Sequence, residues 1–238
     1  MSHAAQTGLR PVSVPSSVDV APPGKPLGTA TATRRAGASD VLLVGNEGHL
    51  EPSGLKVPGS HKGTDQTMMN VSIRPEQAND LEAIRSVNLA AFPGDSEAKL
   101  VDALRAAGKA TVSLVAEQNA RVIGHILFSP VTIASHAGPH PILGLAPMAV
   151  LPAVQRRGVG SLLVTTGLAY CRQANVGVVV VVGHADYYPR FGFQPASRFG
   201  VSCEYEVPDD SFMLLELARG ASDGLSGLAR YQPEFAEL

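Results

Sequence analysis

Five consecutive valines, Val178–Val182, limit the fold more than any other feature of the chain. β-Branched side chains favour an extended strand, and this strand is apolar on both faces. Such a strand has to be covered on both sides, as in the middle of a parallel or mixed sheet. The valine run therefore predicts a layered fold with a sheet inside and helices outside.

Hydrophobic periodicity and turn residues place further elements on both sides of this run. The expected elements, in order, are a strand at Val71–Arg74, helices at Leu81–Ala91 and after Asp95–Ser96, strands at Thr111–Ala116, Arg121–Ile133 and Leu143–Leu151, a helix at Gly158–Ala174, the valine strand, a short helical segment at Tyr187–Tyr188 and a strand at Phe212–Leu217. This order predicts an α/β fold with a mixed, mostly antiparallel central sheet and helices on both faces.

The composition changes near Met68. Residues 1–67 are rich in Pro, Gly, Ser and Thr, and the chain has no aromatic residue before Phe92. Such a segment buries too little apolar surface to offset its ordering entropy, so we expect a disordered N-terminal extension. Met68–Met69 resembles a translation start, which leaves open whether residues 1–67 belong to the native gene product. We expect one domain over residues 68–220 and a C-terminal tail over 221–238.

Charge and cysteine content exclude several function classes. The net charge of −2 gives no basic surface for nucleic acid, and no apolar run approaches the length of a membrane span. Two cysteines, Cys171 and Cys203, are too few for a disulfide framework and lack metal-ligand spacing, which favours a reducing, cytoplasmic location and no metal. His136 and His140 are separated by Gly138–Pro139, so they do not form a helical metal pair. These features do not decide whether the protein forms a homodimer.

The segment Gln155–Gly160 carries the chemistry. It follows an expected strand and opens an expected helix, whose first N–H groups have no partner inside the helix and lie at its positive end. Gly158 and Gly160 let a phosphate approach the backbone, and Arg156 and Arg157 add cationic donors. The spacing is neither that of a P-loop nor G-x-G-x-x-G. The segment therefore predicts a diphosphate-binding turn, and an ordinary strand–helix turn is the alternative.

Two motifs resemble the GNAT superfamily of N-acetyltransferases. Gln155, Gly158 and Gly160 have the spacing of that family's acetyl-CoA pyrophosphate loop, and Tyr188–Phe193 resembles its Tyr-x-x-x-Gly-Phe motif. The resemblance covers Val71 to Leu217. Within the family, Gly183–Phe193 and Tyr205–Met213 are similar to the YhbS-like branch.

The resemblance implies acetyl-CoA as the co-substrate and no metal. It implies a parallel strand pair, carrying Met148 and Val180, that splays apart to admit CoA. In this interpretation, the backbone of the strand pairs with the pantetheine amides, which is compatible with a core role for its side chains. The residues implied in CoA binding are Met148, Ala149, Val150, Gln155, Arg156, Arg157, Gly158, Val159, Gly160 and Ser161.

The catalytic residues are less well specified. The resemblance implies that the Tyr188 hydroxyl serves the departing thiolate, and core packing is the alternative, with Tyr187 the weaker candidate for the role. His184 and Asp186 follow the valine strand, where many family members carry Asn. The candidate general bases are three glutamates: Glu97 at the start of the second helix, and Glu204 and Glu206 before the last strand. A base that acts only through water is the remaining alternative.

We therefore expect an enzyme that moves an acetyl group directly from acetyl-CoA to an amine in a ternary complex. The acceptor is a small molecule or a protein amine. A non-catalytic acyl-CoA-binding or sensing module is the alternative, because it would keep the turn and need no base.

Overall fold

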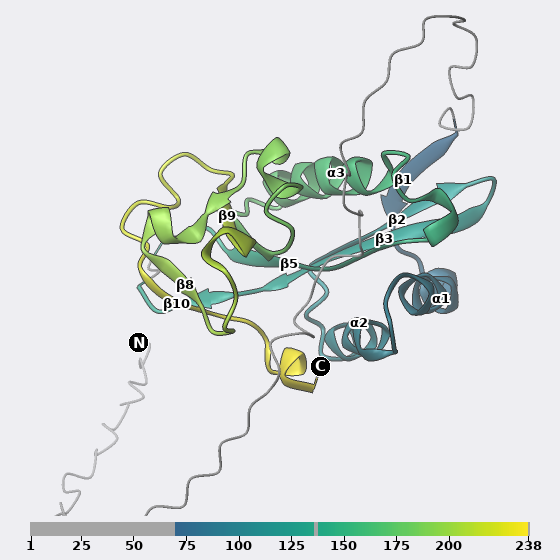
Figure 1. Cartoon of the computed structure of the whole chain (residues 1–238), viewed down its shortest axis with the longest axis horizontal. Coiled ribbons are helices and arrows are strands. Elements are labelled where there is room, and N and C mark those ends of the chain that lie inside the picture. The colour runs from purple at the N-terminus through teal and green to yellow at the C-terminus, as the bar shows by residue number, and fades with distance from the viewer. Residues whose placement is uncertain (1–69, 136–137, 238) are drawn as a thin grey trace, which may run out of the picture. The chain divides into compact units, whose positions relative to one another are not determined.

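The computed structural model describes residues 70–135 and 138–237, so the expected extension at residues 1–67 lies outside the described part. Within these two ranges, a seven-stranded sheet has the order β1-β2-β3-β5-β6-β9-β7, and a three-stranded sheet has the order β4-β10-β8 (Figure 1). The large sheet contains β1 (Val71–Pro75), β2 (Val112–Gln118), β3 (Arg121–Pro130), β5 (Ile142–Val150), β6 (Val178–Val182), β7 (Gln194–Pro195) and β9 (Phe212–Glu216). The small sheet contains β4 (Thr132–Ile133), β8 (Val201–Cys203) and β10 (Gly227–Arg230).

The valine strand β6 lies inside the large sheet, as predicted. All five valines are buried, and β6 pairs parallel with β5 and antiparallel with β9. The parallel pairing ends at Leu145 and Val181, although β5 continues to Val150. The two strands therefore separate at this point, and the predicted fold class, including the splayed parallel pair, is confirmed.

Helices cover both faces of the large sheet. The helices α1 (Leu81–Ala91) and α2 (Ser96–Ala106) lie on one face, and α3 (Val159–Gln173) lies on the other (Figure 1). Alternate valines of β6 enter two separate core clusters, because successive side chains of a strand point to opposite faces. Val180 belongs to the cluster that contains Ile84 of α1, and Val181 to the cluster that contains Leu163 of α3.

The small sheet is the part of the fold that the periodicity did not predict. The single strand expected from Arg121 to Ile133 was wrong: it is interrupted at Val131, and β4 pairs with β10 instead of continuing along β5. Alternation shows that a segment is extended but does not show which sheet it joins.

Residues beyond 220, which the sequence analysis set apart as a tail, contribute β10 and the 3₁₀ helix η7 (Pro233–Glu237). Tyr231 and Phe235 are buried in the core cluster of α1. Lys109, after α2, donates to both carboxylate oxygens of Glu234 at 2.8 and 2.9 Å. These contacts attach the C-terminal residues to the body of the domain.

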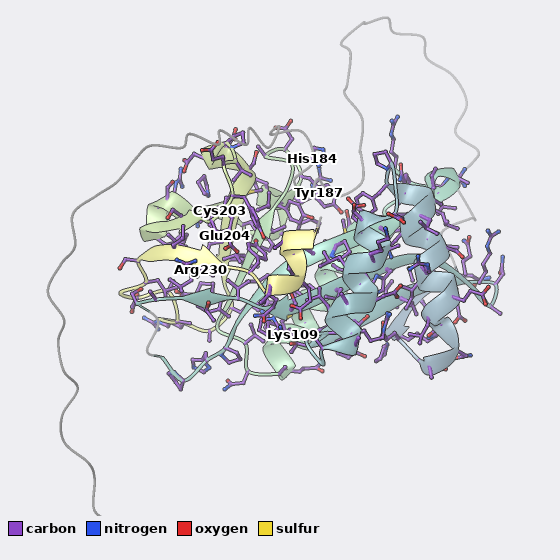
Figure 2. All side chains as sticks on the ribbon, turned by 90° about the horizontal axis from the view of Figure 1, so that it is seen from below. Lys109, His184, Tyr187, Cys203, Glu204 and Arg230 are labelled. Carbon is purple, nitrogen blue, oxygen red and sulfur yellow. The ribbon has the colours of Figure 1, made fainter. Side chains whose placement is uncertain are left out.

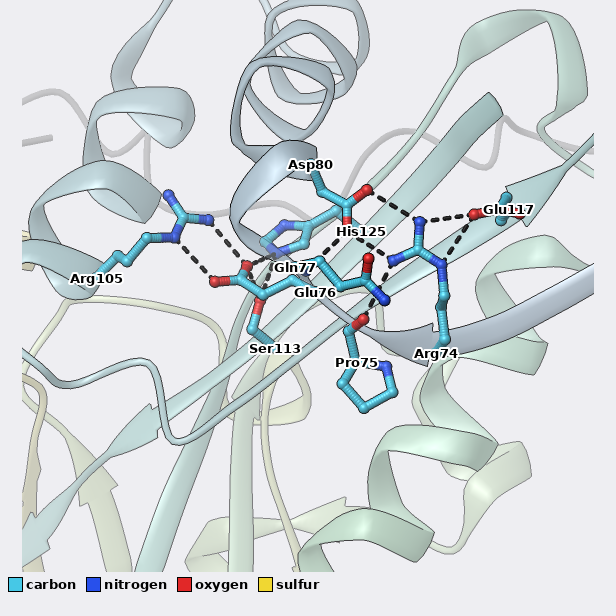
Figure 3. Close-up of polar contacts among 9 residues, drawn as sticks. All are labelled: Arg74, Pro75, Glu76, Gln77, Asp80, Arg105, Ser113, Glu117 and His125. Atoms are coloured by element: carbon cyan, nitrogen blue, oxygen red, sulfur yellow. Dashed lines mark hydrogen bonds and ion pairs between the residues drawn. The ribbon is translucent and has the colours of Figure 1, made fainter. Parts of the chain in front are cut away.

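A polar cluster joins the start of the domain to α2 and the sheet (Figure 3). Glu76 accepts two hydrogen bonds from Arg105 at 2.9 Å each and one from the Ser113 hydroxyl. His125 Nε2 lies 2.9 Å from Ser113 Oγ and 3.7 Å from Glu76 Oε2. Serine and carboxylate thus approach the same imidazole nitrogen, whereas a hydrolytic triad places them on opposite nitrogens. The cluster is therefore structural.

Both titratable members of this cluster favour the folded state at neutral pH. Burial alone would raise the pKa of Glu76, but hydrogen bonds from His125, Arg105 and Ser113 hold that pKa well below its usual range. Burial lowers the pKa of His125, and Glu76 offsets this only partly. Both folded-state pKa values lie below those of the unfolded chain, about 4.3 for Glu and 6.5 for His. Their contribution is complete above these values and is lost as the pH falls.

We expect Glu76→Gln to lower the free energy of unfolding by about 2–3 kcal/mol at pH 7.5, because Arg105 loses its two bonds to the Glu76 carboxylate and keeps only the contact with Asp102 at 3.3 Å. Urea unfolding at several pH values measures this effect. The difference from the parent should narrow below about pH 4.3, because Glu76 then takes up a proton in the unfolded parent but not yet in the folded one. Asp95→Asn, which removes the exposed ion pair with Lys99, is the control and should cost much less than Glu76→Gln. An equal cost for both variants would contradict the structural role of the cluster.

Candidate active site

The predicted glycine turn joins β5 to α3 at the edge where β5 and β6 separate. Arg156 and Gly158 have positive φ angles of 59° and 86°, and Gly158 directly precedes the first residue of α3. Left-handed residues next to right-handed ones can turn neighbouring N–H groups toward one side, and the first N–H groups of α3 lack partners inside the helix. Gln155 Nε2 donates to the carbonyl oxygen of Val150 at 3.0 Å, which fixes the turn against β5. The turn therefore presents donors in the arrangement that an anion needs.

The remaining residues expected in CoA binding adjoin this turn. Met148, Ala149 and Val150 are buried in the last part of β5, beyond the end of its pairing with β6. Val159, Gly160 and Ser161 form the first turn of α3. Arg156 and Arg157 are exposed, and neither takes part in the ion pairs found among residues 70–135 and 138–237. All ten residues thus lie in the last part of β5, in the turn or in the first turn of α3, next to the point where the two strands separate.

Two tyrosine rings pack on glycines of the separating strands, one on each face of the sheet. An ideal Cβ on Gly144 of β5 would lie 2.7 Å from Tyr231 Cε1, and one on Gly183, just after β6, would lie 2.3 Å from Tyr188 Cε2. Tyr231 belongs to the core cluster of α1, and Tyr188 to the cluster of α3. Because the pairing ends at Leu145 and Val181, between these glycines, the two rings flank the point of separation.

The hydroxyls of these two tyrosines are buried, and both have raised pKa values. Neither has a hydrogen-bond partner within the described residues, although both are fully buried. Burial raises the pKa of Tyr188 well above its ordinary value, and Tyr187 adds to this effect. Burial likewise raises the pKa of Tyr231, with contributions from Cys203, Tyr205, Glu204 and Tyr188. Both phenols therefore keep their protons near neutral pH. A buried polar group without a partner is rare, which makes this pair a candidate site.

The three candidate bases come from two elements. Glu97 is half-buried in the first turn of α2, and Glu206 is exposed before β9. Glu204 follows β8 and lies at the small-sheet end of the domain near Cys203 (Figure 2). Glu204 Oε1 accepts a hydrogen bond from the Tyr231 backbone N–H. Glu204 is thus the carboxylate that the structure ties directly to the residue carrying the second buried hydroxyl.

The described cysteines are poor nucleophiles. Burial raises the pKa of Cys171 to about 12 and that of Cys203 to about 11. Thiols with such pKa values remain protonated at neutral pH, and the thiolate is the reactive form. This favours direct transfer over a covalent enzyme intermediate.

Among the described residues, no group of three or more His, Cys, Asp or Glu side chains is placed to hold a metal ion. No helix within residues 70–135 and 138–237 has the length and apolar character needed to cross a membrane.

Residues 72–196 match the family model described as an acetyltransferase (GNAT) domain. The chain is 34% identical to the N-acetyltransferase YhbS of Escherichia coli K12 over 164 residues, which is 68% of this chain and 97% of YhbS. It is 37% identical to the N-acetyltransferase YjhQ of the same organism over 135 residues, which is 56% of this chain and 75% of YjhQ. The chain belongs to the GNAT family of N-acetyltransferases, as the motifs predicted.

Solved structures agree with this family. A crystal structure of YhbS from Escherichia coli in complex with CoA has a TM-score of 0.67 and 32% identity, and the match covers 74% of this chain and 96% of that one. A GNAT acetyltransferase from Brucella melitensis in complex with acetyl-CoA has a TM-score of 0.57 and 36% identity, and the match covers 69% of this chain and 97% of that one.

Tyr231 is the candidate residue that sequence reasoning missed. It lies beyond the expected domain boundary and belongs to no motif of the family resemblance. The aromatic residues Tyr231 and Phe235 in the expected tail were the available signal, because a short segment with such anchors often packs on a core.

We expect Gly183→Ala to destabilise the domain by about 1–3 kcal/mol, because the added methyl group overlaps the Tyr188 ring. Chemical unfolding of the single variant and of Gly183→Ala in a Tyr188→Leu background measures the clash. The alanine should cost less in the second background, because the leucine has no ring to overlap. An unchanged cost there would show that the Tyr188 ring does not occupy this position.

Proposed function

We propose that this protein transfers the acetyl group of acetyl-CoA to an amine by direct attack in a ternary complex. The observation that carries the proposal is the separation of β5 from β6 beside the glycine turn, with two unpartnered buried hydroxyls at the same point. The complexes of YhbS with CoA and of the Brucella protein with acetyl-CoA support CoA as the ligand of this family's splayed strands.

In this proposal, the N–H groups of the glycine turn and the first turn of α3 hold the CoA diphosphate, and Arg156 and Arg157 add positive charge. The pantetheine arm follows β5 over Met148–Val150 as an added strand would, because that stretch of β5 has no pairing with β6. A backbone N–H of this stretch polarises the thioester carbonyl, where negative charge develops during attack.

The proton steps use groups on the two faces of the sheet. Glu204 takes one proton from the ammonium form of the acceptor, and the nitrogen attacks the thioester carbon to form a C–N bond. As the adduct collapses, the C–S bond breaks, and Tyr188 gives its proton to the sulfur. The second proton of the nitrogen restores Tyr188, so the products are an amide, free CoA thiol and one proton. Tyr231 lies opposite Tyr188, where it can orient the acceptor.

A non-catalytic acyl-CoA-binding module is less favoured, because binding alone needs no protonated phenol buried without a partner at the strand separation. The experiment that separates the two functions is an amine panel with acetyl-CoA, containing polyamines, amino acids, aromatic amines and N-terminal and lysine peptides. Release of free thiol above the amine-free rate supports the enzyme. Tight CoA binding with no thiol release for any class would favour the module.

Tyr188→Phe keeps the ring on Gly183 and removes only the hydroxyl. We expect kcat for the best acceptor of the panel to fall by about 10²–10⁴-fold, the usual scale of general-acid assistance, while the Kd of acetyl-CoA changes by less than about threefold. Tyr170→Phe, on the half-buried part of α3, is the matched control and should leave kcat unchanged. If the Tyr188 variant turns over at the parent rate, the hydroxyl has no catalytic role and the ring serves only in packing.

Glu204→Gln keeps a carbonyl oxygen that can accept the Tyr231 N–H, so the local fold should persist. We expect kcat/KM to fall by at least about 10²-fold, because the amide cannot take a proton from the acceptor. Glu206→Gln and Glu97→Gln serve as comparisons and should change kcat/KM by less than about threefold. A larger loss of kcat/KM in the Glu97 variant than in the Glu204 variant would assign the role of the base to Glu97.

A further inference from the structure

Arg190 is held on an aromatic ring that contacts the glycine turn, although it lies 30 residues beyond Gly160 in the sequence. Its guanidinium carbon lies 4.7 Å from the centroid of the Tyr187 ring. One guanidinium nitrogen donates to the carbonyl oxygen of Asp186 at 3.3 Å. Arg190 is in the 3₁₀ helix η4 (Tyr188–Phe191), which follows β6 and packs away from α1 and α2.

The other end of the Tyr187 ring meets the start of α3. Its hydroxyl oxygen lies 3.0 Å from the position of an ideal Cβ on Gly160, and Met148 Cε lies 3.5 Å from the same position. Phe191 packs edge-on against Tyr187 at 5.4 Å between centroids, so the ring is fixed on a second side. One tyrosine ring therefore separates the Arg190 guanidinium from the turn that carries Gly158 and Gly160.

Among residues 70–135 and 138–237, no acidic side chain forms an ion pair with Arg190. Arg190 is exposed. A planar guanidinium stacked on a ring loses little freedom when it binds an anion, and it can make two parallel hydrogen bonds to phosphate oxygens. Arg156 and Arg157 belong to the same turn, so Arg190 would add a cation from a different element.

We propose that Arg190, positioned by Tyr187, is a third cationic contact to the diphosphate of CoA and closes the glycine turn from the η4 side. This inference rests on the proposed function, because it takes CoA as the ligand of the turn. It adds a binding residue from outside the turn, and it makes Tyr187 a positioning residue for that contact.

Calorimetry with the full chain tests the contact without any acceptor. We expect Arg190→Gln to raise the Kd of CoA by about tenfold or more, because a charge-assisted hydrogen bond is lost. The same variant should raise the Kd of dephospho-CoA, which keeps the diphosphate and lacks the 3′-phosphate, by the same factor. An effect on CoA that disappears with dephospho-CoA would overturn the diphosphate assignment, and so would an unchanged Kd for both ligands.

Arg172→Gln is the matched control, because Arg172 is an exposed arginine in the last turn of α3, about 20 Å along the helix from Gly158. It should change neither Kd by more than about threefold. Gly158→Val, which puts a branched residue at a φ of 86° in the turn itself, should lose CoA affinity by at least about tenfold. Thermal unfolding of each variant confirms that it is folded.

A double-variant cycle tests the positioning by Tyr187. A Tyr187→Leu background lacks the aromatic ring on which the Arg190 guanidinium stacks. Adding Arg190→Gln there should raise the Kd of CoA by less than about threefold. The full tenfold effect in that background would overturn the role of the ring. Failure of the parent protein to bind CoA would refute the proposed function, whereas parent binding with an unaffected Arg190 variant refutes this inference alone.

Discussion

The end of the β5–β6 ladder at Leu145 and Val181 is the constraint on which the rest of the site depends. Buried backbone N–H and C=O groups need partners, and parallel strands normally supply them to each other. Here β5 pairs with β3 along one edge as far as Val150, whereas along its other edge the pairing with β6 stops at Leu145. The glycine turn, the start of α3 and the two buried tyrosines are all grouped around that edge. An extended ligand with amide groups is the chemical complement of such an edge.

The sequence predicted the elements whose signals are local. Val178–Val182 specified a strand buried on both faces, and Gly158 specified a left-handed turn before a helix, because both patterns depend on neighbouring residues only. The small sheet was not predicted, because it depends on contacts between residues far apart in the sequence. β4 has two residues and β10 has four, and their pairing joins residues almost 100 positions apart. No short-range periodicity encodes that contact. The contact between Glu204 and the Tyr231 backbone could not be predicted for the same reason, since it spans 27 residues.

Charges in this domain serve two separate purposes. Two ion pairs, Arg105–Glu76 and Arg74–Asp80, lie where α1 and α2 meet β1 and β2, and they hold the helices on the sheet (Figure 3). The arginines around the glycine turn engage in none of the ion pairs seen in the described ranges. Neutralised charges thus stabilise the scaffold on one face, and unneutralised charges remain available at the ligand edge on the other.

The contact between Gly144 and Tyr231 has a consequence for how this domain can vary. The Tyr231 ring, together with Val131 Cγ2 at 2.8 Å, occupies the space that a side chain at position 144 would need, so positions 144 and 231, 87 residues apart, are sterically coupled. Among related chains, a larger residue at the β5 position should occur together with a small one at the C-terminal position. A chimaera that takes its C-terminal strand from one relative and its central strand from another would fold well only if both members of the pair came from the same parent.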